Sequence, residues 1–235
     1  MSKNLRTWIS SPIIADLGQM SLFWREGALR LLAWGRYLWP LRLIAKREAA
    51  AAARLMARVP VSREWMADLG CGAGSAPAAQ RPEPCIGVDR SRRMARRAAG
   101  GRMTHVVCAG INVLPLASAR FELVLAVGVA EYLADPEPLL REAARILRRE
   151  GWLLFTVAPR GWHLAFRRLA GLPVYIHREE DLAGIFPVHH LEIRARAQTA
   201  TQHLYLLQKV RASAVSPSPS WTPASAPGGF TPAQQ

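Results

Sequence analysis

Residues 65–74 carry the residue types that a ligand-binding turn needs. Residues 65–69 are mostly apolar and read as a short strand, with one acid, Asp68, near its end. Glycine then occupies every second position, at Gly70, Gly72 and Gly74. Glycine tolerates positive φ and has no Cβ that would block a ligand. The pattern therefore predicts a strand that leads into a turn whose backbone approaches a nucleotide-like molecule.

The acid ahead of the glycines indicates the charge of that molecule. Dinucleotide-binding turns use the spacing GxGxxG and hold a pyrophosphate. Here the pattern is DxGxGxG. A carboxylate at Asp68 would repel a pyrophosphate and attract an ammonium or sulfonium group. Taken alone, the motif also fits a tight turn in some other kind of α/β domain.

A second acid, Asp89, lies at the end of the next predicted strand. Residues 85–88 are apolar or glycine, as expected for a buried strand, and a helical pattern follows at 91–99. An acid at this position can accept hydrogen bonds from both hydroxyl groups of a ribose. The alternative is that Asp89 only caps the helix that follows it.

Four ordered segments together resemble class I S-adenosylmethionine-dependent methyltransferases, in particular the small-molecule group that includes quinone-biosynthesis enzymes. The segments are the glycine turn, Gly-Val-Asp-Arg-Ser-Arg-Arg-Met at 87–94, Leu-Pro-Leu at 114–116 and the apolar strand at 121–127 with the residues after it. Two positions depart from the family's pattern. Gly110 stands where the family usually has an aspartate for the adenine amino group, and Tyr132 replaces a histidine.

The resemblance implies which residues hold the cofactor, S-adenosylmethionine. Asp68 and the glycine turn would hold its methionine part, and Asp89 would hold its ribose. The backbone of Ile111 and the stem of Arg90 would flank the adenine. The full set of predicted cofactor residues is Asp68, Gly70, Gly72, Gly74, Asp89, Arg90, Ile111, Val127 and Gly128, of which the last two would lie near the sulfonium.

The acceptor side is less well marked in the sequence. A hydroxyl acceptor needs a base to take its proton, and His163, His177 and Tyr132 are the candidates for a catalytic role. A lone histidine is more often a surface or packing residue, so this bland interpretation stands beside the catalytic one. The sequence contains no cluster that would predict a metal site.

The fold expected from this pattern is α/β, with a Rossmann-like, seven-stranded, mostly parallel sheet and a C-terminal antiparallel hairpin. The methyltransferase domain is predicted to span residues 61–210 and to include an insertion at 159–186 that bounds the acceptor pocket. Residues 211–235 are rich in Ser, Pro, Ala and Gly and are predicted to be a disordered tail. Within the domain, the patterns predict a helix at 135–149 and strands at 152–157, 188–198 and 201–210.

Residues 1–60 are predicted to form a helical extension, with helices at 21–39 and 41–58 separated at Pro40. Four tryptophans lie in this segment among many arginines. One interpretation places residues 21–58 at a membrane surface, where tryptophan and arginine are both favoured. The other packs them on the α/β domain as a lid. The broad apolar stripe favours packing.

Composition limits the partners and the compartment. The net charge of +14 suits nucleic acid, anionic lipid or acidic substrates, and equally a solvated arginine-rich surface. No RNA-binding module is recognisable, so nucleic acid is not the expected partner. The spacing of the three cysteines predicts neither disulfides nor zinc, which favours the cytoplasm. We expect no signal peptide and no spanning helix.

The sequence thus predicts an enzyme that transfers a methyl group from S-adenosylmethionine to a small-molecule, hydrophobic acceptor. Three alternatives stay open at this stage. The chain could keep the fold as a non-catalytic interaction module, which Gly110 and the missing histidine favour slightly. It could methylate RNA or protein, or it could act on lipid through the helices of residues 21–58.

Overall fold

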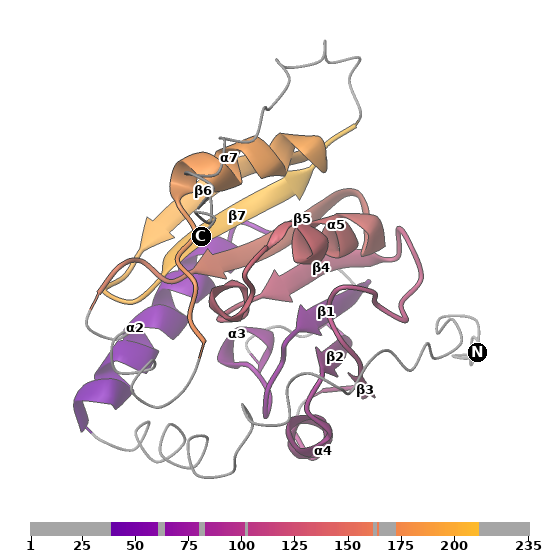
Figure 1. The fold of residues 1–235 in the computed structure, drawn as a ribbon. Coiled ribbons are helices and arrows are strands. Elements are labelled where there is room, and N and C mark those ends of the chain that lie inside the picture. Colours follow the sequence, from indigo (N-terminus) through magenta and orange to yellow (C-terminus); the bar gives the residue numbers. More distant parts are fainter. Residues whose placement is uncertain are drawn as a thin grey trace, which may run out of the picture.

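The computed structural model describes residues 39–60, 64–79, 83–101, 103–161, 164 and 173–211. Within them lies one seven-stranded sheet in the order β3-β2-β1-β4-β5-β7-β6 (Figure 1). The strands are β1 (Trp65–Leu69), β2 (Cys85–Asp89), β3 (His105–Cys108), β4 (Phe121–Ala126), β5 (Leu147–Val157), β6 (Leu191–Gln198) and β7 (His203–Lys209). Strands β1 to β5 pair in parallel, and β7 is antiparallel to both β5 and β6. This architecture confirms the predicted fold class.

The order of the strands fixes where a ligand can bind. The chain runs outward from β1 through β2 to β3 and then returns to place β4 on the other side of β1. In open parallel sheets a crevice forms at such a reversal, beyond the carboxyl ends of the strands. The predicted glycine turn follows β1, and Gly128 follows β4, so both lie at the carboxyl ends of the strands beside this reversal.

Helices cover the two faces of the sheet. They are α2 (Trp39–Met56), α3 (Ala76–Ala79), α4 (Arg92–Ala99), the short 3-10 helix η2 (Ala130–Tyr132), α5 (Glu137–Ile146) and α7 (Glu179–Val188). Helices α5 and α7 pack on one face, and α2 and α3 pack on the other, which gives two buried apolar clusters. All six residues of β4 are buried because both of its faces are covered.

Helix α2 packs on the sheet through its C-terminal half. Its buried side chains are Ala51, Ala52, Leu55 and Met56, which lie against β-strand residues such as Leu204 and Leu206. Glu48 also accepts a hydrogen bond from the hydroxyl of Thr201, in the turn between β6 and β7. The described part of the N-terminal extension therefore follows the packing interpretation. Among the described residues, none of the helices combines the length and the apolar character needed to cross a bilayer.

Several predicted boundaries are wrong. The helix expected at 135–149 ends at Ile146, and β5 begins at Leu147 instead of 152. The chain extends early because Leu147 pairs with Phe121 of β4 and Arg148 forms an ion pair with the buried Glu122. Within β5 the backbone bends at Glu150, which has a positive φ, and the strand then continues.

The strand expected to begin at Val188 begins at Leu191, because α7 continues through Pro187 to Val188 and His190 turns the chain with a φ of 56°. Other expectations lie outside the described residues. They concern the helix at 21–39 apart from its last residue, most of the first half of the insertion at 159–186, and the tail apart from residue 211.

The docking of α2 gives a first testable prediction. Leu55 is 4% exposed, whereas Leu43 on the same helix is 43% exposed. We expect Leu55→Ala to lower the free energy of unfolding by about 2–5 kcal/mol, since it removes buried contacts and leaves a cavity. Leu43→Ala should change it by no more than about 0.5 kcal/mol. Urea unfolding measures both, and equally small effects would contradict the packing of α2.

Candidate functional site

The glycine turn lies beyond the tip of β1 and folds over the neighbouring strand. The backbone N–H groups of Gly70 and Cys71 both donate to the carbonyl oxygen of Val88, at 2.7 Å and 3.0 Å. Gly70, Gly72 and Gly74 all have positive φ, at 70°, 57° and 105°. Each of the three predicted glycines therefore occupies a backbone conformation that other residues rarely adopt.

The three glycines differ in what surrounds them. A Cβ on Gly70 would lie 2.4 Å from Cγ2 of Val129, so this position is filled by a side chain from the segment after β4. A Cβ on Gly72 or on Gly74 would meet nothing within 4 Å. Gly70 thus packs against Val129 after β4, while the backbone at Gly72 and Gly74 borders open space.

The Asp89 carboxylate joins the turn to α4. Its Oδ2 accepts a hydrogen bond from the N–H of Gly72 at 2.9 Å, and its Oδ1 accepts one from the N–H of Ser91 at 2.8 Å. The N-cap of α4 is Ser91, whose Oγ accepts a hydrogen bond from the N–H of Met94. Asp89 therefore supports Ser91 and the glycine turn, and it is not itself the helix cap that the alternative interpretation expected. A carboxylate has about four lone-pair sites, so Asp89 retains acceptor capacity for a ligand's hydroxyl groups.

The Asp68 carboxylate is the most unusual group in the site. Its side chain is 1% exposed, and its Oδ2 has no hydrogen-bond partner among the described residues. Burial raises the pKa of Asp68 to about 7, against a lowering hydrogen bond from Ser75 and a further raising effect of the Asp89 charge. An opposite charge beside such an acid favours its ionised form, so this pair of acids suits a cationic ligand.

The segment after β3 borders Asp89 on the other side. The N–H of Ala109 donates to the carbonyl oxygen of Asp89 at 3.1 Å. Ile111 is half-buried and packs against the core, while Gly110 is exposed and a Cβ there would meet nothing within 4 Å. Arg90 is exposed as a whole. Burial of part of its side chain lowers its pKa, and the charge of Asp89 offsets only part of this lowering. These positions surround the space in front of Asp89.

Val127 and Gly128, at the tip of β4, lie across the site from the segment after β3. Val127 is half-buried, and Gly128 has a φ of 69° and donates its N–H to Oγ1 of Thr156 on β5 at 2.8 Å. A Cβ on Gly128 would lie 3.6 Å from Nε2 of Gln202 and 3.7 Å from Oε1 of Glu131. An amide and a carboxylate that are 74 and 3 residues away in sequence therefore converge on this glycine.

The structure describes two of the three predicted catalytic candidates. Nε2 of His177 lies 2.9 Å from the carbonyl oxygen of Ala130, so this ring nitrogen fastens the segment before α7 to η2. Tyr132 is half-buried on η2 and packs with Ala158 and Val174. The structure thus brings His177 and Tyr132 to the same short helix. His163 lies outside the described residues.

Sequence reasoning missed several residues of this site. Ser75 supports Asp68, Thr156 holds Gly128, and Gln202 faces Gly128 from the turn between β6 and β7. Glu131 was visible in a motif but not identified as a site residue. No local pattern marks Gln202 or Thr156. The parallel pairing of β5 with β4 brings Thr156 to the tip of β4, and the pairing of β7 with β5 brings Gln202 there.

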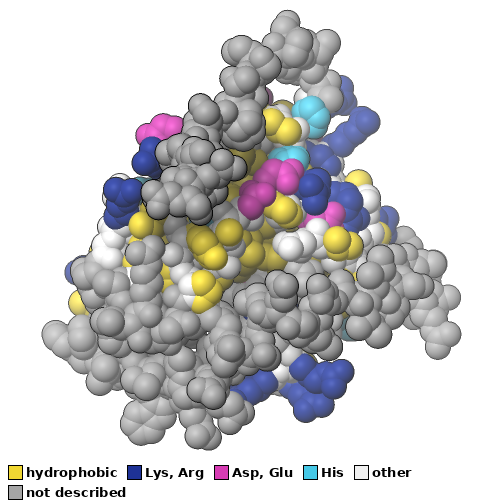
Figure 2. All heavy atoms as spheres, viewed as in Figure 1, with side chains coloured by type: hydrophobic (Ala, Val, Ile, Leu, Met, Phe, Trp, Pro, Cys, Tyr) yellow, Lys and Arg dark blue, Asp and Glu magenta, His cyan; other side chains and the backbone are white. Residues whose placement is uncertain are grey.

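Two of the three cysteines are buried thiols. Burial is the main cause that raises the pKa of the Cys71 thiol, to about 12, and burial also raises that of Cys85, so neither is an activated nucleophile. Within the described ranges, no group of three His, Cys, Asp or Glu side chains could hold a metal ion. Basic side chains lie around the edge of the face in Figure 2, including its lower edge, where Figure 1 places α4.

Comparison with known families and sequences agrees with this geometry. Residues 67–155 match the profile of a family described as "Methyltransferase domain". The malonyl-[acyl-carrier protein] O-methyltransferase of Methylovorus sp. (strain MP688) is 31% identical over 112 residues, a match that covers 42% of this chain and 38% of that protein. The chain therefore matches about two-fifths of the length of this relative.

Solved structures share the fold. Magnesium protoporphyrin IX methyltransferase from Synechocystis PCC 6803, determined with bound S-adenosylhomocysteine, superposes with a TM-score of 0.58 at 19% identity, over 70% of this chain and 83% of that one. Geranyl diphosphate C-methyltransferase from Streptomyces coelicolor A3(2) gives a TM-score of 0.58 at 16% identity, over 69% of this chain and 78% of that one. At these identities the likeness concerns the fold.

The raised pKa of Asp68 makes the stability of the free protein depend on pH. An unfolded aspartate has its ordinary pKa of 3.8, but burial raises the pKa of folded Asp68 to about 7, so it keeps its proton up to about that pH. Between these values the folded state binds more protons, so its stability falls as the pH rises. We expect the free energy of unfolding of Asp68→Asn to rise by about 2 kcal/mol relative to that of the wild type between pH 5 and pH 8.

Chemical denaturation at the two pH values measures this gain. Asp135→Asn is the control, because Asp135 is exposed at the start of α5. A difference between wild type and Asp68→Asn that does not change with pH would show that Asp68 is ionised in the folded protein throughout.

Proposed function

We propose that this chain, which carries a class I methyltransferase domain, transfers a methyl group from S-adenosylmethionine to a small-molecule acceptor. One observation carries the proposal. Two buried acids, Asp68 and Asp89, lie on neighbouring strands and are joined by a glycine turn whose open side is bare backbone. This arrangement suits a ligand with a cationic amino-acid part and a ribose.

The residues present fit that cofactor. The unpartnered Oδ2 of Asp68 would accept a hydrogen bond from the ammonium group, directly or through water. Asp89 would bind the ribose, and the space over Gly72 and Gly74 would take the chain between the two. S-adenosylmethionine supplies a methyl group on a sulfonium, which is already a good leaving group. The protein therefore needs chiefly to orient the two reactants and to exclude water.

The acceptor would lie beyond Gly128, against η2 and the segment before α7. Tyr132, Val174 and Ile176 make this region apolar, which suits a hydrophobic acceptor. Glu131 and Gln202 add polar groups next to Gly128. Because a relative methylates malonyl-[acyl-carrier protein], a malonyl thioester is the first acceptor to be assayed. His163, His177 and Tyr132 stay predicted as candidates for the base that a hydroxyl acceptor would need.

We place the enzyme in the cytoplasm. The three cysteines Cys71, Cys85 and Cys108 are all free thiols, which supports a reducing compartment. Contact of residues 21–58 with a membrane surface stays a proposal, and residues 21–38 of that segment lie outside the described part of the chain.

Calorimetric titration with S-adenosylhomocysteine tests the proposal. We expect micromolar binding, about −7 to −8 kcal/mol, which Asp89→Ala abolishes since it removes both the ribose acceptor and the support of the turn. Asp135→Ala is the matched control, because Oδ1 of Asp135 accepts a hydrogen bond from the backbone N–H two residues on, as Oδ1 of Asp89 does, but at the start of α5. Wild-type protein that does not bind the ligand would overturn the cofactor assignment, and with it the enzyme.

The substitution Gly110→Asp tests the orientation of the adenine. Gly110 is exposed, has room for a side chain and stands where related enzymes carry an aspartate. We expect Gly110→Asp to tighten binding of S-adenosylhomocysteine by about 2–10-fold, the worth of one added hydrogen bond. Gly110→Ala serves as the control. An aspartate that binds no better than the alanine would place the adenine elsewhere.

A further inference from the structure

The segment between β3 and β4 bears on cofactor binding although it contains no helix or strand. It starts beside Asp89 at Ala109 and passes through Ile111, whose N–H would face the adenine under the proposed function. Asn112 and Val113 are then exposed, Val113 by 65%. The chain re-enters the core at Leu114. Such a segment needs anchors from elsewhere if its backbone is to keep one position.

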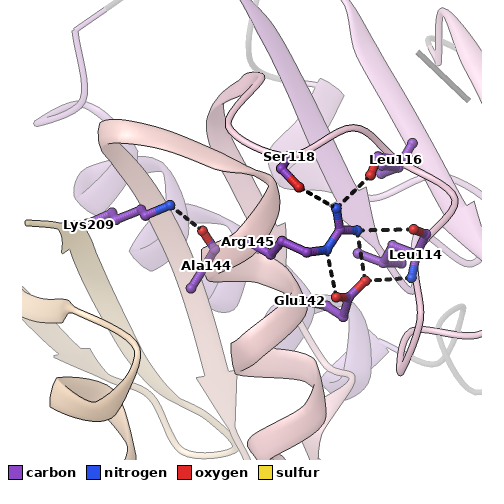
Figure 3. Close-up of polar contacts among 7 residues, drawn as sticks. All are labelled: Leu114, Leu116, Ser118, Glu142, Ala144, Arg145 and Lys209. Atoms are coloured by element: carbon purple, nitrogen blue, oxygen red, sulfur yellow. Dashed lines mark hydrogen bonds and ion pairs between the residues drawn. The ribbon is translucent and has the colours of Figure 1, made fainter. Parts of the chain in front are cut away.

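Those anchors are two side chains of α5, Glu142 and Arg145 (Figure 3). Oε2 of Glu142 accepts a hydrogen bond from the N–H of Leu114 at 2.6 Å. Nη2 of Arg145 donates to the carbonyl oxygen of Leu114 at 3.1 Å. Both backbone groups of one residue, three positions after Ile111, are therefore held by the same helix.

Arg145 fixes the segment at two further points. Its Nη1 donates to the carbonyl oxygen of Leu116 and to Oγ of Ser118, both at 2.9 Å. Its Nε and Nη2 donate to the two oxygens of Glu142 at 2.7 Å and 2.9 Å. The five N–H donors of a guanidinium thus meet five acceptors. Lysine cannot reproduce this fork of donors.

The charge state of Glu142 supports the arrangement. Burial alone would raise its pKa, but the hydrogen bonds from Arg145 and Leu114 and the charges of Arg145 and Arg141 lower it below the ordinary value. Glu142 is therefore ionised at neutral pH, and its oxygens accept from all of these donors.

We propose that Glu142 and Arg145 are positioning residues for adenine recognition, which they control by fixing the backbone that presents the N–H of Ile111. The inference rests on the proposed function and deepens it. It gains weight from Gly110, because this chain has no aspartate there to read the adenine amino group. Recognition then depends on a backbone donor, whose position depends on its anchors.

Two ligands test the proposal. S-adenosylhomocysteine offers an unprotonated ring nitrogen to the N–H of Ile111, whereas S-inosylhomocysteine carries a hydrogen on that nitrogen and cannot accept. We expect the wild type to prefer S-adenosylhomocysteine at least tenfold by calorimetry. Arg145→Lys and Glu142→Gln should reduce this preference to threefold or less, mainly through weaker binding of the adenine ligand. Ser118→Ala, which removes one acceptor, should have a smaller effect in the same direction.

The pair Glu122 and Arg148 provides the matched control. It also joins a buried glutamate to an arginine, but it links β4 to β5 and not to the segment after β3. Glu122→Gln and Arg148→Lys should cost stability and leave the preference unchanged. The inference is overturned if the Glu142 and Arg145 variants keep the wild-type preference, or lose affinity for both ligands equally. If the larger changes prevent folding, Ser118→Ala decides, and an unchanged preference there also overturns the inference.

A wild type that binds neither ligand would instead overturn the proposed function. A wild type that binds both ligands equally would leave the cofactor site standing and overturn this inference alone.

Discussion

The site depends on keeping two carboxylates close together in a place that water barely reaches. Asp68 is 1% exposed and Asp89 is 8% exposed, and burial together with the charge of Asp89 raises the pKa of Asp68. Removing a carboxylate from water is costly unless it is protonated or paired with a cation. The free protein meets this cost partly by holding a proton on Asp68 near neutral pH. A bound ammonium group would replace that proton, so the same constraint that weakens the free fold favours a cationic ligand.

The surrounding structure keeps this pair in place. The backbone of the glycine turn donates to Asp89, and Val129 packs so closely on Gly70 that no Cβ fits between them. The glycine turn is therefore fixed between β2 and the segment after β4. This contact sets the position of the turn relative to Gly128 at the tip of β4. On the far side, α5 holds the segment after β3 through Glu142 and Arg145. The glycine turn, the tip of β4 and the segment after β3 thus all depend on backbone groups that are fixed by side chains from other elements.

Much of this could be predicted from the sequence where chemistry and local pattern coincide. Asp68, the three glycines and Asp89 stand at strand ends that periodicity alone reveals, and the structure places them together. Alternation at 188–198 and 201–210 predicted the closing hairpin, whereas the parallel sheet as a whole followed from the resemblance to the methyltransferase family. The end of the helix before β5 was missed because it is decided by pairing of Leu147 with Phe121 and by the Arg148–Glu122 ion pair, which are contacts between distant segments.

The acceptor side was harder to predict for the same physical reason. Thr156 reaches Gly128 through the pairing of β5 with β4, and Gln202 reaches it through the antiparallel pairing of β7 with β5. Nothing in their immediate sequence marks either residue. His177 was identified by residue type, but its Nε2 bonds to backbone. Glu142 and Arg145 read simply as the polar face of a helix. Residue type can reveal charged groups at strand ends, but it cannot reveal which polar groups a fold will bring to them.

The proton balance of ligand binding tests the central claim most directly. The heat of binding of S-adenosylhomocysteine at pH 7, compared between buffers of different ionisation enthalpy, gives the number of protons released. If the ammonium group displaces the proton of Asp68, about half a proton leaves per ligand bound, as expected for a group titrating near that pH. Binding that releases no proton would show that Asp68 does not meet the cation, and would contradict the account.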